Sequence, residues 1–343
     1  MLAPSLLPQA FHPIAAGLGF GVPPRVFWPY FSGTAILLLG LAAILRPGAP
    51  RPHGRQGIFR FAPLCFAIPM AIFGAEHFTV ASAVATLVPS WIPGHLFWVY
   101  FVGVALLAAA LSLAVKRLLP LSSALLGLMI LLFVLLIAVP SWFSTHDNVS
   151  FTLVLRDSVL GSCSCAFAAS LTPQWGKLRT RGVITVTRFL VAGVMVVYGV
   201  DHLLYPYAAP GIPPQNTEFN ATMPSWIPAH AVWARATGAL LIACALGLAS
   251  RKLARVAATT LGVIVLVLIA LVYVPLAIAR ASSIGTGLNY LAIHFALAGA
   301  ALLLAAALPG PLPQPVNAAR AHAPSITPSP VPDSVFRPAL GPK

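Results

Sequence analysis

Charged side chains are scarce in this sequence, which has 6 Asp and Glu and 20 Lys and Arg among 343 residues. Hydrophobic residues make up 59% of the chain and run in uninterrupted blocks far longer than the core of a soluble protein needs. The blocks also lack the period-two alternation of membrane β-barrel strands. The composition therefore excludes a soluble fold and favours membrane-spanning helices.

Cysteines are few, and no metal or nucleotide signature is present. Cys65, Cys163, Cys165 and Cys244 all fall within hydrophobic blocks and include no Cys-x-x-Cys pair. This placement disfavours thiol–disulfide relay chemistry and is typical of small packing residues. The first 26 residues lack a basic n-region and a small-residue cleavage pattern, so we expect them to belong to the mature chain.

Nine hydrophobic blocks each approach the roughly 20 residues that cross a bilayer as an α-helix. The sequence thus predicts an all-α polytopic membrane protein with about nine transmembrane helices. The blocks lie at 27–45, 58–78, 96–115, 119–142, 151–171, 183–205, 231–250, 254–278 and 287–308.

Basic residues gather in alternate connections between these blocks, where 16 of the 20 Lys and Arg lie. Because such residues collect on the cytoplasmic side of a membrane, the pattern predicts an outside N-terminus and a cytoplasmic C-terminus. Their dispersal over five connections argues against a nucleic-acid partner. The Pro-rich stretch 309–343 is expected to be a disordered cytoplasmic tail.

Two short motifs occur twice. PSWIPGH (89–95) returns as PSWIPAH (224–230), and FGAEHF (73–78) corresponds to YGVDHL (198–203). Prolines before a helix and tryptophans at interface depth serve as an entry cap and an aromatic belt, which explains most of the repetition. The residues assigned this structural role are Trp91, Pro93, Trp98 and Gly103, with Trp226, Pro228, Trp233 and Gly238 as their second copies.

The repetition predicts two tandem four-helix bundles in parallel orientation, repeat 1 at 58–171 and repeat 2 at 183–308. An even number of spans returns the chain to its starting side, so both repeats share one orientation. A basic cytoplasmic linker, 172–182, joins them. The N-terminal segment 1–57 holds one further helix (27–45), a partial copy expected to pack outside the first bundle.

The pattern Gly-x-Glu/Asp-His, a loop, and Pro-x-Trp-Ile-Pro-x-His before a helix resembles the DoxX-like family of four-helix bacterial membrane proteins, in a tandem form covering 58–308. The resemblance implies a place in the bacterial cytoplasmic membrane. Some relatives resemble the membrane subunit of a thiosulfate:quinone oxidoreductase, and others partner redox enzymes. The resemblance therefore implies that this protein is a redox-associated accessory subunit, with quinone as candidate ligand and a redox enzyme as candidate partner.

Five residues of repeat 1 form a candidate polar pocket at its outer face: Glu76, His77, His95, Arg156 and Asp157. We expect the short loop to bring the two histidines together, and imidazole carries protons near neutral pH, which suits quinol chemistry. Two imidazoles and a carboxylate are also potential metal ligands, although the spacing matches no compact metal motif.

The charges within repeat 1 have an alternative, structural interpretation. An unpaired charge inside the membrane costs about 2–3 kcal/mol, so Arg156 and Asp157 should be paired and turned inward, which equally fits a structural ion pair. Repeat 2 has Ala292 and Ile293 at the best-matching positions, followed by His294. Its candidate counterparts to the pocket are Asp201, His202, His230, Arg235 and Asn289.

Two other functions remain open. The internal duplication fits a small-solute or ion transporter, which is weakened by the absence of Gly/Pro-broken spans at equivalent midplane positions. A non-catalytic membrane scaffold, whose polar residues only hold helices together, is the third reading.

Overall fold

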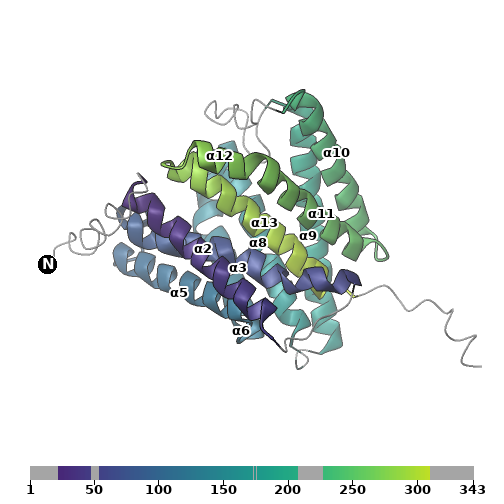
Figure 1. Ribbon diagram of the computed structural model, residues 1–343, viewed down its shortest axis with the longest axis horizontal. Helices are drawn as coiled ribbons and strands as arrows, with labels where there is room; N and C mark the ends of the chain where they lie inside the picture. The colour runs from purple at the N-terminus through teal and green to yellow at the C-terminus, as the bar shows by residue number, and fades with distance from the viewer. Residues whose placement is uncertain (1–21, 48–53, 173, 175, 208–226, 310–343) are drawn as a thin grey trace, which may run out of the picture. The chain divides into compact units, whose positions relative to one another are not determined.

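The structure, a computed structural model, describes residues 22–47, 54–172, 174, 176–207 and 227–309. Every secondary-structure element in these residues is helical, which confirms the predicted all-α class (Figure 1). The α-helices are α2 (Pro24–Leu45), α3 (Ala62–Thr79), α4 (Ala81–Ala85), α5 (His95–Val115), α6 (Leu119–Phe133), α7 (Val139–Thr145), α8 (Asn148–Ser170), α9 (Lys177–Leu204), α10 (His230–Ala249), α11 (Ala254–Leu268), α12 (Val274–Ala279) and α13 (Tyr290–Ala307).

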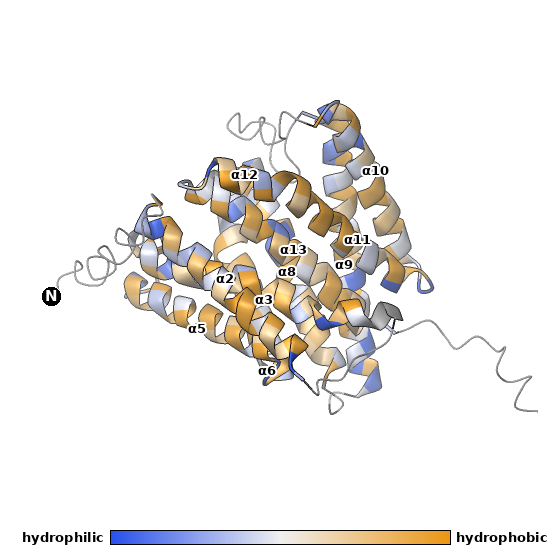
Figure 2. Cartoon of the chain, in the orientation of Figure 1, coloured by the Kyte–Doolittle hydropathy of each residue, from blue (hydrophilic) through white to orange (hydrophobic). Residues whose placement is uncertain are grey.

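Nine helical stretches of the described residues are long and apolar enough to cross a membrane, and each overlaps one of the predicted blocks. Figure 2 shows hydrophobic residues along the bodies of these helices and hydrophilic residues toward several of their ends. The prediction of an all-α polytopic membrane protein is therefore confirmed. The expected tail at 309–343 lies, except for Pro309, outside the described residues.

Prolines and left-handed residues mark where helices begin. Pro24, Pro63 and Pro120 lie in the first turns of α2, α3 and α6, where a missing N–H costs no hydrogen bond. Gly94 (φ 70°) and Ala229 (φ 55°) precede α5 and α10 at matching positions of the repeated motif. The two copies of this motif thus end in the same backbone conformation, which favours glycine over alanine.

The helices of the two repeats pair in the same way. Within repeat 1, α3 packs on α5 and α6 on α8; within repeat 2, α9 packs on α10 and α11 on α13. The two repeats also pack on each other: α3 lies against α13, and α8 lies against both α9 and α13. Helix α2 packs on α3 and α5, as expected for a partial copy outside the first bundle. The structure therefore joins the two repeats through helices far apart in sequence.

Close glycine contacts explain the first pairing in each repeat. A Cβ added at Gly103 would lie 3.2 Å from the carbonyl oxygen of Gly74, and one at Gly238 would lie 2.6 Å from that of Gly199. Small residues let the backbones of membrane helices approach this closely. The repeated Gly103 and Gly238 are thus required by the crossing of α3 with α5 and of α9 with α10.

The third span of each repeat is interrupted by a π-helical segment, η2 (Val134–Ala138) in repeat 1 and η5 (Ile269–Tyr273) in repeat 2. Pro140 and Pro275 follow these segments by two residues. A proline lacks the N–H of a regular α-helix and clashes with the carbonyl one turn earlier, which favours such local widening. The third spans therefore share a local widening at equivalent positions, although each remains one continuous helical stretch.

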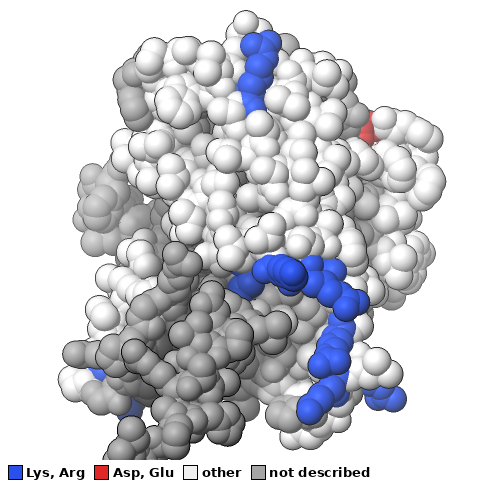
Figure 3. Space-filling model, turned by 90° about the vertical axis from the view of Figure 1, so that its right-hand side faces the viewer, with Lys and Arg blue, Asp and Glu red and all other residues white. Residues whose placement is uncertain are grey.

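Basic side chains gather on part of the surface. Figure 3 shows Lys and Arg in a curved band on one face. Arg60 donates from Nη2 to the carbonyl oxygen of Ile44 (2.7 Å) at the end of α2. Burial, and then the charge of Arg60, lower the pKa of Lys116 in the α5–α6 connection. Two basic connections that the sequence assigned to the same side of the membrane are thus near one another.

Candidate functional site

The predicted pocket residues of α3 and α5 lie near the ends of their helices. Glu76 is buried, and its Oε1 has no hydrogen-bond partner among the described residues. His77 donates from Nδ1 to the carbonyl oxygen of Phe73 (2.7 Å), because a carbonyl only accepts. His95 is the first residue of α5 and is half-buried.

Arg156 and Asp157 form an ion pair on α8. The guanidinium contacts the carboxylate twice, with Nε–Oδ1 at 2.7 Å and Nη2–Oδ2 at 3.1 Å. The side chains are 19% and 22% exposed. The expected pairing is therefore confirmed, and two parallel hydrogen bonds hold the guanidinium plane in place.

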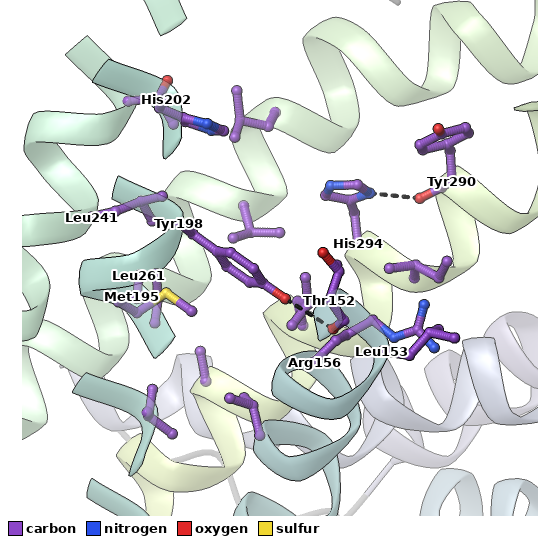
Figure 4. A pocket seen from close by; sticks show the side chains of 18 of the residues that line it. Thr152, Leu153, Arg156, Met195, Tyr198, His202, Leu241, Leu261, Tyr290 and His294 are labelled. Atoms are coloured by element: carbon purple, nitrogen blue, oxygen red, sulfur yellow. Dashed lines mark hydrogen bonds between the residues drawn. The ribbon is translucent and has the colours of Figure 1, made fainter. Parts of the chain in front are cut away.

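A cavity of about 230 Å³ lies among α8, α9, α10, α11 and α13 (Figure 4). Most of its lining is apolar, including Leu153, Met195 and Leu261. Arg156 is the member of the predicted repeat 1 pocket that lines it; Glu76, His77, His95 and Asp157 do not. The polar side chains of the lining are Thr152, Arg156, Tyr198, His202, Thr237, Tyr290 and His294.

His294 is fixed by two contacts. Its Nδ1 donates to the carbonyl oxygen of Tyr290 at 2.7 Å, and its ring stacks on Tyr273 with centroids 3.6 Å apart and planes 19° apart. Because Nδ1 carries a proton, Nε2 of the neutral ring is an acceptor. Figure 4 shows this second nitrogen pointing away from Tyr290, on the side of His202.

His202 has no such anchor. It is 2% exposed, and its Nε2 has no hydrogen-bond partner among the described residues. Its Cβ lies at the glycine crossing, 2.8 Å from where a Cβ at Gly238 would be, so the backbone fixes its place in α9. On the same helix, Tyr198 donates from its hydroxyl to the carbonyl oxygen of Thr152 (3.4 Å). Two imidazoles from different helices thus line one largely apolar space.

His294 has no role in the predicted site, because the match of the last helices by sequence sets Asp157 opposite Ile293, one residue before His294. A Cβ at Gly127 would lie 2.7 Å from Gly161 O, and one at Gly262 would lie 3.3 Å from Ala298 O. These equivalent contacts pair Gly161 with Ala298. Asp157 then corresponds to His294 rather than to Ile293. The small residues facing Gly127 and Gly262 are the sequence signal that could have set this alignment.

The other counterparts in repeat 2 do not line the cavity. Asp201 is half-buried near the end of α9, His230 begins α10, and Arg235 is exposed on α10. The Oδ1 of Asn289 is buried without a hydrogen-bond partner among the described residues.

The repeated tryptophans of the described residues lie on the surface of the protein. Trp91, Trp98 and Trp233 are exposed, and Trp98 donates from Nε1 to the carbonyl oxygen of Pro93 (3.2 Å). Pro228 is also exposed. Trp226 lies outside the described residues.

Within the described part of the chain, no group of three or more His, Cys, Asp or Glu side chains is placed to hold a metal ion. Comparisons with protein-family models, with curated proteins and with solved structures gave no match. Any chemistry assigned to the cavity must therefore be argued from its own residues.

Proposed function

We propose that the protein is a redox-associated membrane subunit that binds the head group of a quinone in the cavity lined by His202 and His294. The main support for this proposal is that the buried imidazoles of His202 and His294 both line a largely apolar space. The cavity, at about 230 Å³, is smaller than the roughly 300–1,000 Å³ typical of pockets for drug-sized ligands, so it suits a single ring with its oxygen substituents.

The hydrogen-bonding pattern fits the reduced form of such a ring. Nε2 of neutral His294 accepts a hydrogen bond from a hydroquinone O–H, while His202, whose tautomer no neighbour fixes, accepts from or donates to the second oxygen. Oxidation of a hydroquinone releases two protons and two electrons. The imidazoles can take the protons, and the electrons require a redox enzyme as partner.

The wider assignment also belongs to this proposal. The repeated motifs support membership of the DoxX-like family and a place in the bacterial cytoplasmic membrane. The gathering of Lys and Arg on one face (Figure 3) supports placing that face toward the cytoplasm, with the N-terminus outside and the C-terminus inside.

A matched pair of variants tests quinone binding. His202 and His77 hold equivalent places beside the repeated glycines, but only His202 lines the cavity. In lipid nanodiscs, His202→Leu should weaken binding of decylubiquinol, measured by calorimetry, about 5–10-fold through loss of one hydrogen bond. His77→Leu should leave the affinity unchanged. No binding by the wild type, or equal weakening by both variants, would refute the proposal.

A transporter is the second candidate, and the paired π-helical segments favour it. Interruptions at corresponding positions of two repeats are typical of transport sites, and π-helical turns often lie at functional sites. Proteoliposomes should then accumulate a solute from a panel of organic acids and inorganic ions, and Pro140→Ala or Pro275→Ala should slow the uptake. Background uptake of every solute by the wild type would exclude this function for the panel.

A further inference from the structure

Five buried side-chain oxygen atoms outside the histidine-lined cavity have no hydrogen-bond partner among the described residues. Two are the hydroxyls of Ser123 and Tyr273. The other three are Oε1 of Glu76 on α3, the hydroxyl of Tyr30 on α2 and Oδ1 of Asn289 at the end of the π-helical segment η6 (Ile284–Asn289). Buried polar atoms are nearly always hydrogen-bonded, and an unpaired one is costly. Three in one region therefore point to a missing partner.

Helices α2 and α3 place Tyr30 close to the depth of Glu76. Thr79 Oγ1 donates to the carbonyl oxygen of Arg25 (3.2 Å), and Ser32 Oγ donates to that of Ala71 (2.9 Å). These two contacts make the helices antiparallel. Tyr30, between Arg25 and Ser32, is thus level with the part of α3 that contains Glu76.

The contact between α3 and α13 places Asn289 at the same depth. A Cβ added at Gly299 would lie 2.6 Å from the backbone nitrogen of Phe66. Glu76 follows Phe66 by the same number of residues as Asn289 precedes Gly299. Because the two helices are expected to run in opposite directions, these equal steps along each axis bring the two residues level.

The remaining contact among the three elements is between α2 and η6. Helix α2 packs on η6, and a Cβ added at Gly287 would lie 3.6 Å from the hydroxyl of Tyr30. Each of the three elements is therefore in contact with the other two, since α13 continues directly from η6.

We infer that Glu76, Tyr30 and Asn289 form a binding site for a small monovalent cation of the sodium class. Carboxylate, amide and hydroxyl oxygens are the ligands of hard cations. The carboxylate of Glu76 balances the single positive charge of the cation, so the site with its cation bound is neutral. An isolated charge buried in the membrane would cost free energy. No Lys, Arg or His forms an ion pair with Glu76 in the described residues, so the cation fills a role that no side chain takes.

The site is separate from the proposed quinone cavity, since none of its three residues lines that cavity. A cation that binds only the folded protein raises its melting temperature. In detergent at pH 8 and constant ionic strength, NaCl replacing choline chloride should raise the Tm of the wild type by about 3 °C for each tenfold increase above the dissociation constant. KCl and LiCl in the same titration give the selectivity.

Variants decide whether the shift comes from this site. Glu76→Gln should abolish the dependence on NaCl, and Asn289→Ala should move its midpoint at least threefold higher. Asp201→Asn, the counterpart in repeat 2, should behave as the wild type. If Glu76→Gln does not fold, Tyr30→Phe takes its place, with a threefold or greater rise in the midpoint supporting the site and an unchanged midpoint contradicting it. A wild-type Tm insensitive to all three cations, or an equal NaCl response in Glu76→Gln, would overturn the proposal.

Discussion

Residues 58–171 and 183–308 share a helical framework but differ in the polar groups inside it. Both repeats have the glycine crossing between their first two helices and a π-helical segment before the proline of the third span. In the last helix, the ion pair of Arg156 and Asp157 in repeat 1 corresponds to Ile293 and His294 in repeat 2.

The difference separates residues that build the fold from residues that build a site. The positions that let backbones approach are alike in both copies, because any side chain there would clash in either repeat. The polar positions have diverged, and the cavity lies where α8 of repeat 1 meets four helices of repeat 2. An apparently symmetric framework therefore holds an asymmetric site.

The largest expected effect comes from filling a glycine crossing. Gly238→Ala places a Cβ 2.6 Å from the backbone oxygen of Gly199, so the helices must separate, and we expect a loss of about 3 kcal/mol in stability. Gly103→Ala meets mainly side chains, at 2.8 and 2.9 Å, and should cost less. Thermal unfolding in detergent measures both.

Gly193 on α9 is the matched control, since an added Cβ would have no atom within 4 Å apart from the nearby backbone of its own helix. Gly193→Ala should leave the Tm unchanged or raise it, because alanine is the better helix former. Equal losses at Gly193 and Gly238 would mean that the close crossing does not set the effect.

The ion pair of repeat 1 gives the next largest effect. Arg156→Ala leaves Asp157 with no partner in a largely buried place and should cost about 2 kcal/mol, below the 3–5 kcal/mol of a fully buried pair because both side chains keep some exposure. Arg156→Ile combined with Asp157→His gives repeat 1 the residues of repeat 2 and should cost less than the single change. Tm values of the two variants test this, and a larger loss in the double variant would show that the repeats do not tolerate the same residues.

Substitution of the two equivalent histidines should change the stability differently. His77→Leu removes a hydrogen bond to the carbonyl oxygen of Phe73 and should cost about 1 kcal/mol. His202→Leu removes a buried nitrogen without a hydrogen-bond partner and should leave the stability equal or higher. A residue whose loss weakens ligand binding without destabilising the fold is typical of a functional position. A stability loss of 1 kcal/mol or more for His202→Leu would indicate a structural role instead.

The sequence predicted the framework well and the site poorly, for physical reasons. Hydrophobic block length fixes the spans, and the repeated motifs locate the first two helices of each repeat. The packing of α3 on α13 joins residues more than two hundred positions apart, which no local pattern encodes. The cavity depends on the packing of α8 on α9 and α13, which likewise joins the two repeats, so the grouping of Arg156 with His202 and His294 could not be read from spacing.

The smallest expected effect concerns the start of the last helix in each repeat. Asp147 accepts a hydrogen bond from the backbone N–H of Ser150 (2.8 Å) and caps α8, whereas α13 continues from η6 with no side-chain cap. Hydrogen bonds from Thr145 and Ser150 lower the pKa of Asp147 from its usual 3.8 to about 2. A carboxylate with a lowered pKa stabilises the fold fully above its usual pKa, and this contribution is lost as the pH falls through about 2.

Acidification should therefore speed amide hydrogen exchange in the first turn of α8, relative to the intrinsic rate at each pH, and leave the exchange of α13 unchanged. Asp147→Asn, which keeps a capping oxygen without the charge, should make the exchange of α8 independent of pH in this range; an acid response that survives this substitution would assign the effect to another group.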